Sequence, residues 1–148
     1  MSWNSHITVA CVVEREGRFL LVEERVAGGL VLNQPAGHWD EGETLFQAAV
    51  RETLEESAWE VELIALLGLY AYKPEHLDYG FLRVAFAART LQHHPRRALD
   101  EDIERTVWLS RDELAAETAR HRSPMVLRGV DDYLAGRRYP LELVAHLR

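Results

Sequence analysis

Two acidic side chains occupy one stripe of a predicted helix, at positions where leucine would be usual. The segment 44–57 contains good helix formers and neither Pro nor Gly. At about 100° per residue, one stripe of this helix holds Leu45, Ala49, Glu52 and Glu56. Two like charges one turn apart beside apolar surface repel each other and lose hydration. A bound proton, a cation, or water at an open helix end must therefore relieve the charge.

Clustered glutamate oxygens suit hard divalent cations such as Mg2+ or Mn2+. The small Ala48 and Ala49 would leave room beside the carboxylates. The alternative is a solvated acidic helix end, in which Arg51 pairs with Glu55 across one turn. The helix alone leaves both interpretations open.

The elements around this helix predict a mixed sheet. Segments 6–14 and 19–22 read as a β-hairpin, and an extended segment, 30–37, leads into the helix. Further strands are predicted at 61–72, 81–90 and 106–109. Ser110 and Glu113 form a capping-box pattern, and a last helix covers roughly 125–135 before Gly136. The order β-β-β-α-β-β-β-α-α predicts an α/β (α+β) fold, with helices against both faces of the sheet.

Composition indicates one globular domain spanning 1–148. Apolar residues make up 47% and charged residues 28%, and the net charge is −7 with dispersed basic residues. Neither a nucleic-acid surface nor a membrane surface is expected, because each needs concentrated Lys and Arg. The single Cys11 lies in an apolar run and reads as a small core residue. No signal-peptide pattern or membrane-length apolar run is found, so we expect a cytoplasmic protein.

The spacing of Gly37, Glu43 and the run RETLEESAW (51–59) resembles the Nudix box, Gly-x5-Glu-x7-Arg-Glu-U-x-Glu-Glu-x-Gly-U, where U is bulky and apolar. Two positions depart from it: Ala58 replaces the closing Gly, and Thr53 replaces an aliphatic residue. Gly suits the left-handed conformation common just past a helix end, so Ala58 implies local strain or a different termination. The resemblance implies a Nudix-type αβα sandwich and hydrolysis of phosphoanhydrides with a divalent cation.

The resemblance also implies roles for individual residues. Arg51 would orient the carboxylates, and Glu43 would have a structural or supporting role. A further ligand or base is expected on the acidic loop before the 106–109 strand, for which we choose Glu101 and Asp102. The general base stays open between these two and the box glutamates. The predicted Mg2+ ligands (Mn2+ being an alternative) are Glu52, Glu56, Glu55 and the Ala36 carbonyl.

Four residues outside these groups are predicted to bind substrate: Asn33, Gln34, His38 and Arg83. The first three flank the box and carry hydrogen-bonding groups, although a role in the loop fold is the alternative. Arg83 lies in an apolar strand, where an unpaired cation would be costly. It would therefore meet a phosphate or a carboxylate at the sheet edge.

Nearly the whole chain resembles the NudJ type of small bacterial Nudix phosphatases, including ITVACVV (7–13), NQPAGH (33–38) and GRRYPLE (136–142). That type acts on thiamine pyrophosphate, hydroxymethylpyrimidine pyrophosphate and nucleoside di- and triphosphates. The resemblance thus implies a small-molecule di- or triphosphate substrate and release of phosphate, by a monomer or homodimer. A pyrophosphohydrolase that releases pyrophosphate and a non-catalytic Nudix-fold binding module are the alternatives.

Overall fold

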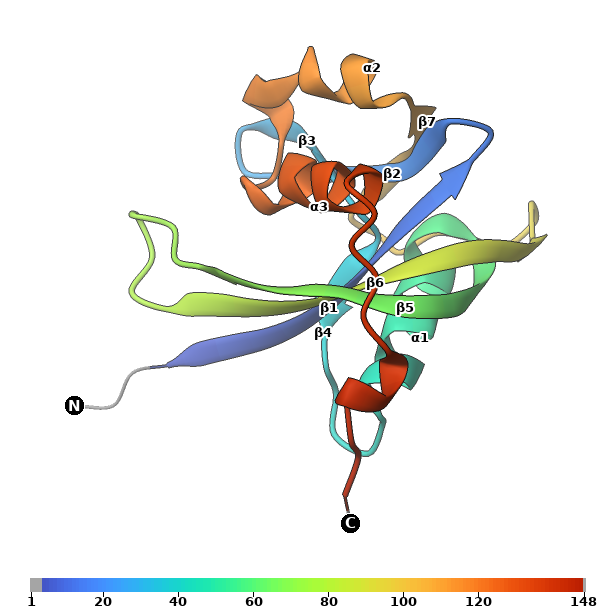
Figure 1. Cartoon of the computed structure of the whole chain (residues 1–148). Helices are drawn as coiled ribbons and strands as arrows, with labels where there is room; N and C mark the ends of the chain where they lie inside the picture. Colours follow the sequence, from blue (N-terminus) through green and yellow to red (C-terminus); the bar gives the residue numbers. More distant parts are fainter. Residues whose placement is uncertain (1–3, 148) are drawn as a thin grey trace.

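The computed structural model describes residues 4–147, which form one mixed sheet with helices on both sides (Figure 1). The strands are β1 (Ser5–Arg15), β2 (Arg18–Val26), β3 (Gly29–Asn33), β4 (Ala36–His38), β5 (Trp59–Tyr72), β6 (Gly80–His93) and β7 (Ile103–Leu109). The helices are α1 (Leu45–Ser57), α2 (Arg111–Ala115) and α3 (Met125–Leu134), with short 3-10 turns at Thr118–Arg120 and Leu141–Leu143. The predicted strands and helices are present, and the three-residue β4 is an addition.

The long strand β1 connects the two halves of the sheet. The strand order is β3-β2-β1-β6-β5, with β4 paired to β1 and β7 paired to β2. Strands β1 and β6 run parallel, whereas β5 and β6 are antiparallel. The predicted mixed sheet is therefore confirmed.

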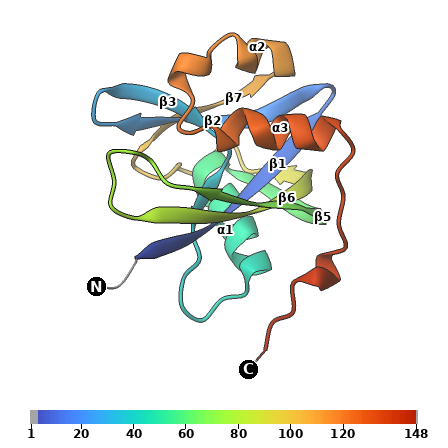
Figure 2. The same cartoon turned by 60° about the vertical axis from the view of Figure 1, so that its left-hand side comes forward.

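The alternating side chains of β1 contribute to two cores. Val9, Cys11 and Val13 belong to the cluster that includes Ala48 and Ala49 of α1. Val12 points the other way, into the cluster that includes Val126 and Val130 of α3. Figure 2 shows α1 and α3 on opposite sides of the strands. This arrangement confirms the predicted αβα sandwich.

Both ends of α1 are fixed by local interactions. Thr44 Oγ1 accepts a hydrogen bond from the Gln47 N–H at 3.0 Å, and Gln47 Oε1 accepts one from the Thr44 N–H at 2.9 Å. At the other end, Ala58 takes the left-handed conformation with φ 61°. Ala58 stands where the Nudix box has Gly, so of the two predicted alternatives the structure has local strain, and the helix does not end differently.

The predicted start of α2 and the predicted end of α3 are both present. Ser110 and Glu113 form the capping box of α2. Gly136 follows α3 with φ 84°. Over residues 4–147 the helices are too short or too polar to span a lipid bilayer.

Candidate active site

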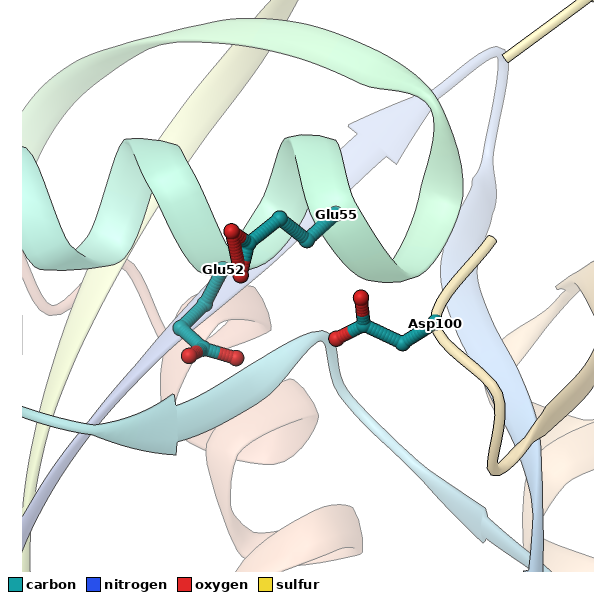
Figure 3. Close-up of side chains that lie close together, drawn as sticks. All are labelled: Glu52, Glu55 and Asp100. Atoms are coloured by element: carbon teal, nitrogen blue, oxygen red, sulfur yellow. The ribbon is translucent and has the colours of Figure 1, made fainter. Parts of the chain in front are cut away.

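Helix α1 and the loop before β7 together form an acidic cluster. One carboxylate oxygen each from Glu52, Glu55 and Asp100 lies within 4.8 Å of the others. In Figure 3, Glu52 and Glu55 project from α1, and Asp100 approaches from the facing loop. The Glu52 side chain is only 12% exposed, whereas Glu55 is 32% exposed and pairs with Arg51 at 3.0 Å, so the solvated helix end describes Glu55 but not Glu52.

The backbone selects Asp100, and not its two acidic neighbours, for this cluster. The Asp100 N–H donates to the Glu55 carbonyl at 3.0 Å, which ties the loop to α1. The Arg25 N–H donates to the Asp102 carbonyl at 2.7 Å, and the Arg25 guanidinium binds the Glu101 carbonyl. The structure therefore does not bring the Glu101 and Asp102 side chains, predicted as ligands, into the cluster. The acidic run that led to the choice of Glu101 and Asp102 also contains Asp100, so the predicted ligands were one and two residues away from the residue that the structure selects.

Arg51 organises the box carboxylates. Its guanidinium donates to Glu43 at 2.7 and 2.9 Å, to Glu52 at 2.7 Å and to Glu55 at 3.0 Å. A further bond reaches the His38 carbonyl at 3.2 Å. The Arg51 hydrogen bond is the main reason that the pKa of Glu43 is lowered. These contacts agree with the orienting role that the resemblance implies for Arg51.

Gly37 lets the Glu52 carboxylate lie against strand β4. A Cβ on Gly37 would lie 2.2 Å from Glu52 Cδ and 2.2 Å from Glu52 Oε2. Any larger residue would therefore displace this carboxylate. The position of the Glu52 carboxylate depends on this close backbone approach, which is a physical reason for Gly at this position of the box.

Glu56 lies one turn beyond Glu52 and accepts a hydrogen bond from the Ala36 N–H at 3.0 Å. Burial raises the pKa of Glu56 to about 8, and repulsion from Glu52 adds to the effect, against the Ala36 hydrogen bond. Burial also raises the pKa of Glu52. Both carboxylates are thus destabilised as anions and would be stabilised by a nearby cation.

A cavity of about 500 Å³ opens beside these carboxylates. It is bordered by acidic, basic and aromatic side chains from separate elements. The acidic residues include Glu52 and Glu56, and the basic ones are Arg83 and Arg122. The remaining lining residues include Ala36, Gly37, His38, Asn33, Tyr72, Tyr79 and Phe81. A cavity with cation-binding and anion-binding groups suits a metal-bound phosphate compound.

Arg83 is a buried cation held by neutral groups. Its residue surface is 5% exposed, and its guanidinium donates to Gln34 Oε1 and to Asn33 Oδ1, each at 3.1 Å. No carboxylate of residues 4–147 forms an ion pair with it, and the Arg83 Nε has no hydrogen-bond partner among these residues. Burial lowers the pKa of Arg83 to about 10, so it stays charged near neutral pH. The structure therefore does not show the alternative in which Arg83 pairs with a carboxylate at the sheet edge.

The other predicted substrate-binding residues lie in different positions. Asn33 lines the cavity, whereas Gln34 is 2% exposed and donates from Nε2 to the Val126 carbonyl at 2.7 Å. His38 is exposed at the cavity rim, with its Nε2 2.9 Å from Nδ1 of His6. Sequence reasoning did not identify Arg122, which lines the cavity and pairs with Glu24 at 3.0 Å, and no local pattern singled it out.

The donor set fits a hard divalent cation. Glu52, Glu55 and Asp100 offer oxygen ligands only, which is the chemistry that Mg2+ and Mn2+ prefer. Ala36 lies beside Glu56 at the cavity wall, where its carbonyl was predicted to be a ligand. Burial is the main reason that the pKa values of Glu52, Glu56 and Asp100 are raised, and repulsion from neighbouring carboxylates adds to it; for Glu52 this holds in spite of the Arg51 guanidinium 2.7 Å away.

Comparisons with known proteins define the class. The NUDIX domain family matches residues 4–128, so the chain belongs to the Nudix family, and its fold and box are those of a Nudix hydrolase. The chain is 39% identical to phosphatase NudJ of Escherichia coli strain K12 over 140 residues, which cover 94% of this chain and 90% of that protein. Phosphatase NudJ of Shigella flexneri is equally similar.

Solved structures agree with this assignment. A NUDIX hydrolase from Nitrosomonas europaea superimposes with a TM-score of 0.94 at 39% identity, covering 97% of this chain and 98% of that chain. A MutT NUDIX hydrolase from Burkholderia pseudomallei has a TM-score of 0.73 at 19% identity, covering 87% and 98%. The second likeness concerns the fold alone.

Proposed function

We propose that this Nudix hydrolase is a Mg2+-dependent phosphatase. Its substrate would be a nucleoside di- or triphosphate or a thiamine-related pyrophosphate, from which it releases phosphate. The observation that carries the proposal is one cavity in which Glu52 and Glu56 lie together with the buried cation Arg83, while Glu52 also belongs to the acidic cluster with Glu55 and Asp100. The similarity to phosphatase NudJ supports release of phosphate.

The acidic residues would hold the cation. Glu52, Glu55 and Asp100 supply oxygens from two elements, and Glu56 with the Ala36 carbonyl lies next to them on the cavity wall. Bound Mg2+ neutralises phosphate charge and lowers the pKa of coordinated water. Arg51 maintains the positions of Glu52 and Glu55 through its hydrogen bonds.

Glu56 is our candidate for the proton acceptor. It faces the cavity, and burial raises its pKa to about 8 in the metal-free protein; a bound cation would lower this pKa and keep Glu56 ionised, as a proton acceptor must be. Arg83 would bind a non-bridging oxygen of the phosphate chain and so fix the substrate against the acidic wall. This role needs no carboxylate partner on Arg83, in agreement with its contacts.

A substrate panel tests the proposal. The purified chain is incubated with thiamine pyrophosphate, hydroxymethylpyrimidine pyrophosphate, nucleoside di- and triphosphates and ADP-ribose, with Mg2+ and with EDTA. We expect Mg2+-dependent release of phosphate from at least one of the first three classes. A product that is pyrophosphate would favour the pyrophosphohydrolase, and absence of all hydrolysis with Mg2+ would favour the binding module.

The same panel with Mn2+ in place of Mg2+ identifies the preferred cation. We expect Mg2+ to be preferred, because a protein that acts in the cytoplasm, as the sequence predicts, would meet Mg2+ as the more abundant of the two ions. Size-exclusion chromatography with light scattering would decide between the predicted monomer and homodimer.

A further inference from the structure

We propose that Asn33 and Gln34 are positioning residues that keep Arg83 free of a negative partner, so that its charge serves a phosphate in the cavity. Neither residue is assigned to contact substrate in this proposal. Each holds one terminal nitrogen of the guanidinium with a neutral amide oxygen. The inference deepens the proposed function and rests on it for the identity of the anion.

The geometry shows how the two amides fix the guanidinium. Asn33 ends β3 and Gln34 follows it, while Arg83 comes from β6 on the other side of β1 and β2. Gln34 is itself fixed, because its Nε2 donates to the Val126 carbonyl in the first turn of α3. The oxygen of Gln34 must therefore point toward Arg83. Helix α3 thus sets the orientation of the cation through one buried amide.

The neutral partners leave binding capacity on Arg83. A guanidinium has five N–H groups, of which residues 4–147 engage two, and Nε–H is buried without a partner. Burying a cation with only neutral partners is costly, and most proteins pair it with an acid. Because Arg83 lines the cavity, an incoming phosphate would supply the missing charge.

The isosteric variant Asn33→Asp tests this idea. It adds a carboxylate where the amide oxygen now accepts from Arg83, and it changes the size of the side chain hardly at all. We expect the affinity of the EDTA-treated protein for inorganic phosphate and for inorganic pyrophosphate, measured by calorimetry, to fall at least about tenfold. The melting temperature should be unchanged or higher, because the buried cation gains a partner.

Two further variants complete the test. Gln92→Glu adds the same charge near the far end of β6, roughly 30 Å away at the usual strand rise, and should leave anion affinity within about threefold of the wild type. Gln34→Glu adds the charge from the second amide, in case the first variant fails to fold; because it also removes the donor to the Val126 carbonyl, its melting temperature should fall. Both Asn33→Asp and Gln34→Glu are folded if near-ultraviolet dichroism matches the wild type.

The outcomes separate this inference from the proposed function. Phosphate affinity within threefold of the wild type in a folded Asn33→Asp or Gln34→Glu variant would overturn the inference, whatever the substrate panel gives. If no substrate of the panel is hydrolysed, the proposed enzymatic function is refuted. The phosphate-binding measurements would still decide the role of the two amides. The inference is supported by a tenfold loss of phosphate affinity in Asn33→Asp with an undiminished melting temperature, or by the same loss in a folded Gln34→Glu variant, since a purely structural role would lower stability and spare the anion.

Discussion

Replacement of Glu56 by Gln should stabilise the metal-free protein while removing activity. Glu56 has a usual pKa of 4.5 when unfolded and a pKa of about 8 when folded, mainly through burial. The folded state therefore binds more protons than the unfolded state between these values, and stability falls as pH rises from about 4.5 to 8. At about 1.4 kcal/mol per pH unit, the loss at pH 7 reaches at most about 3 kcal/mol. Gln has the same shape, carries no charge and still accepts the Ala36 N–H.

The measurement is urea or thermal unfolding between pH 5 and pH 8.5, in EDTA and in Mg2+. In EDTA at pH 8 we expect Glu56→Gln to be more stable than the wild type by about 1–3 kcal/mol, with the gain vanishing near pH 4.5. In Mg2+ the order should reverse, because the ion stabilises the ionised wild type by binding only to the folded state. The rate of phosphate release should fall at least about 100-fold.

Glu55→Gln is the matched control. Glu55 lies on the same helix but is 32% exposed and forms an ion pair with Arg51, so its replacement should bring no gain in EDTA at any pH. The reasoning on Glu56 is refuted if Glu56→Gln is no more stable than the wild type at pH 8 in EDTA. It is equally refuted if Mg2+ stabilises the variant as strongly as the wild type.

Three more substitutions probe separate features. Gly37→Ala places a methyl group 2.2 Å from the Glu52 carboxylate, so kcat/KM should fall at least about 100-fold. The melting temperature should change little, because the flexible end of the Glu52 side chain can move away. A fall in stability without loss of activity would contradict this expectation. Ala58→Gly relieves the left-handed strain at φ 61° and should raise the free energy of unfolding in urea by up to about 1 kcal/mol, while Ala58→Val should lower it. Glu23→Gln removes a buried carboxylate bound by Arg105 and Arg120, whose hydrogen bonds lower its pKa, with Arg105 the main cause. This variant should lose about 1–2 kcal/mol of unfolding free energy in urea at pH 7. The difference from the wild type should disappear as the pH falls below about 4 and through the lowered pKa of folded Glu23, because the wild-type carboxylate is then protonated too. A difference that stays constant with pH would indicate that packing, and not charge, is its cause.

Local patterns account for most of what the sequence predicted. The helix that carries Glu52 and Glu56 follows from its composition and spacing, and the capping box at Ser110 follows from two residues three apart. The left-handed Ala58 is one of the two alternatives that the sequence left open, local strain or a different termination, because a missing Gly leaves the backbone requirement of the helix end in place. The Thr44–Gln47 capping box had the same kind of signal and could have been read from the sequence.

The choice among consecutive acids was not local. Asp100 enters the cluster because its N–H binds the Glu55 carbonyl, and Arg25 holds the backbone of the next two residues. These contacts join segments that are distant in sequence, so no pattern within the loop could select Asp100 over Glu101 or Asp102. Loop residues with the same chemistry are separated only by the tertiary structure.

Asn33 and Gln34 illustrate the same limit for function. From the sequence, two amides beside the box suggested contacts to substrate. In the structure their oxygens hold Arg83, and Gln34 is fully buried away from the cavity. The amides at the end of β3 and the cation on β6 are separated in the sheet by β2 and β1, so only the folded sheet brings them together. The chemistry of the site thus depends on a neutral pair of amides as much as on its acids, because a carboxylate at either position would neutralise Arg83, the buried cation that lines the cavity beside Glu52 and Glu56.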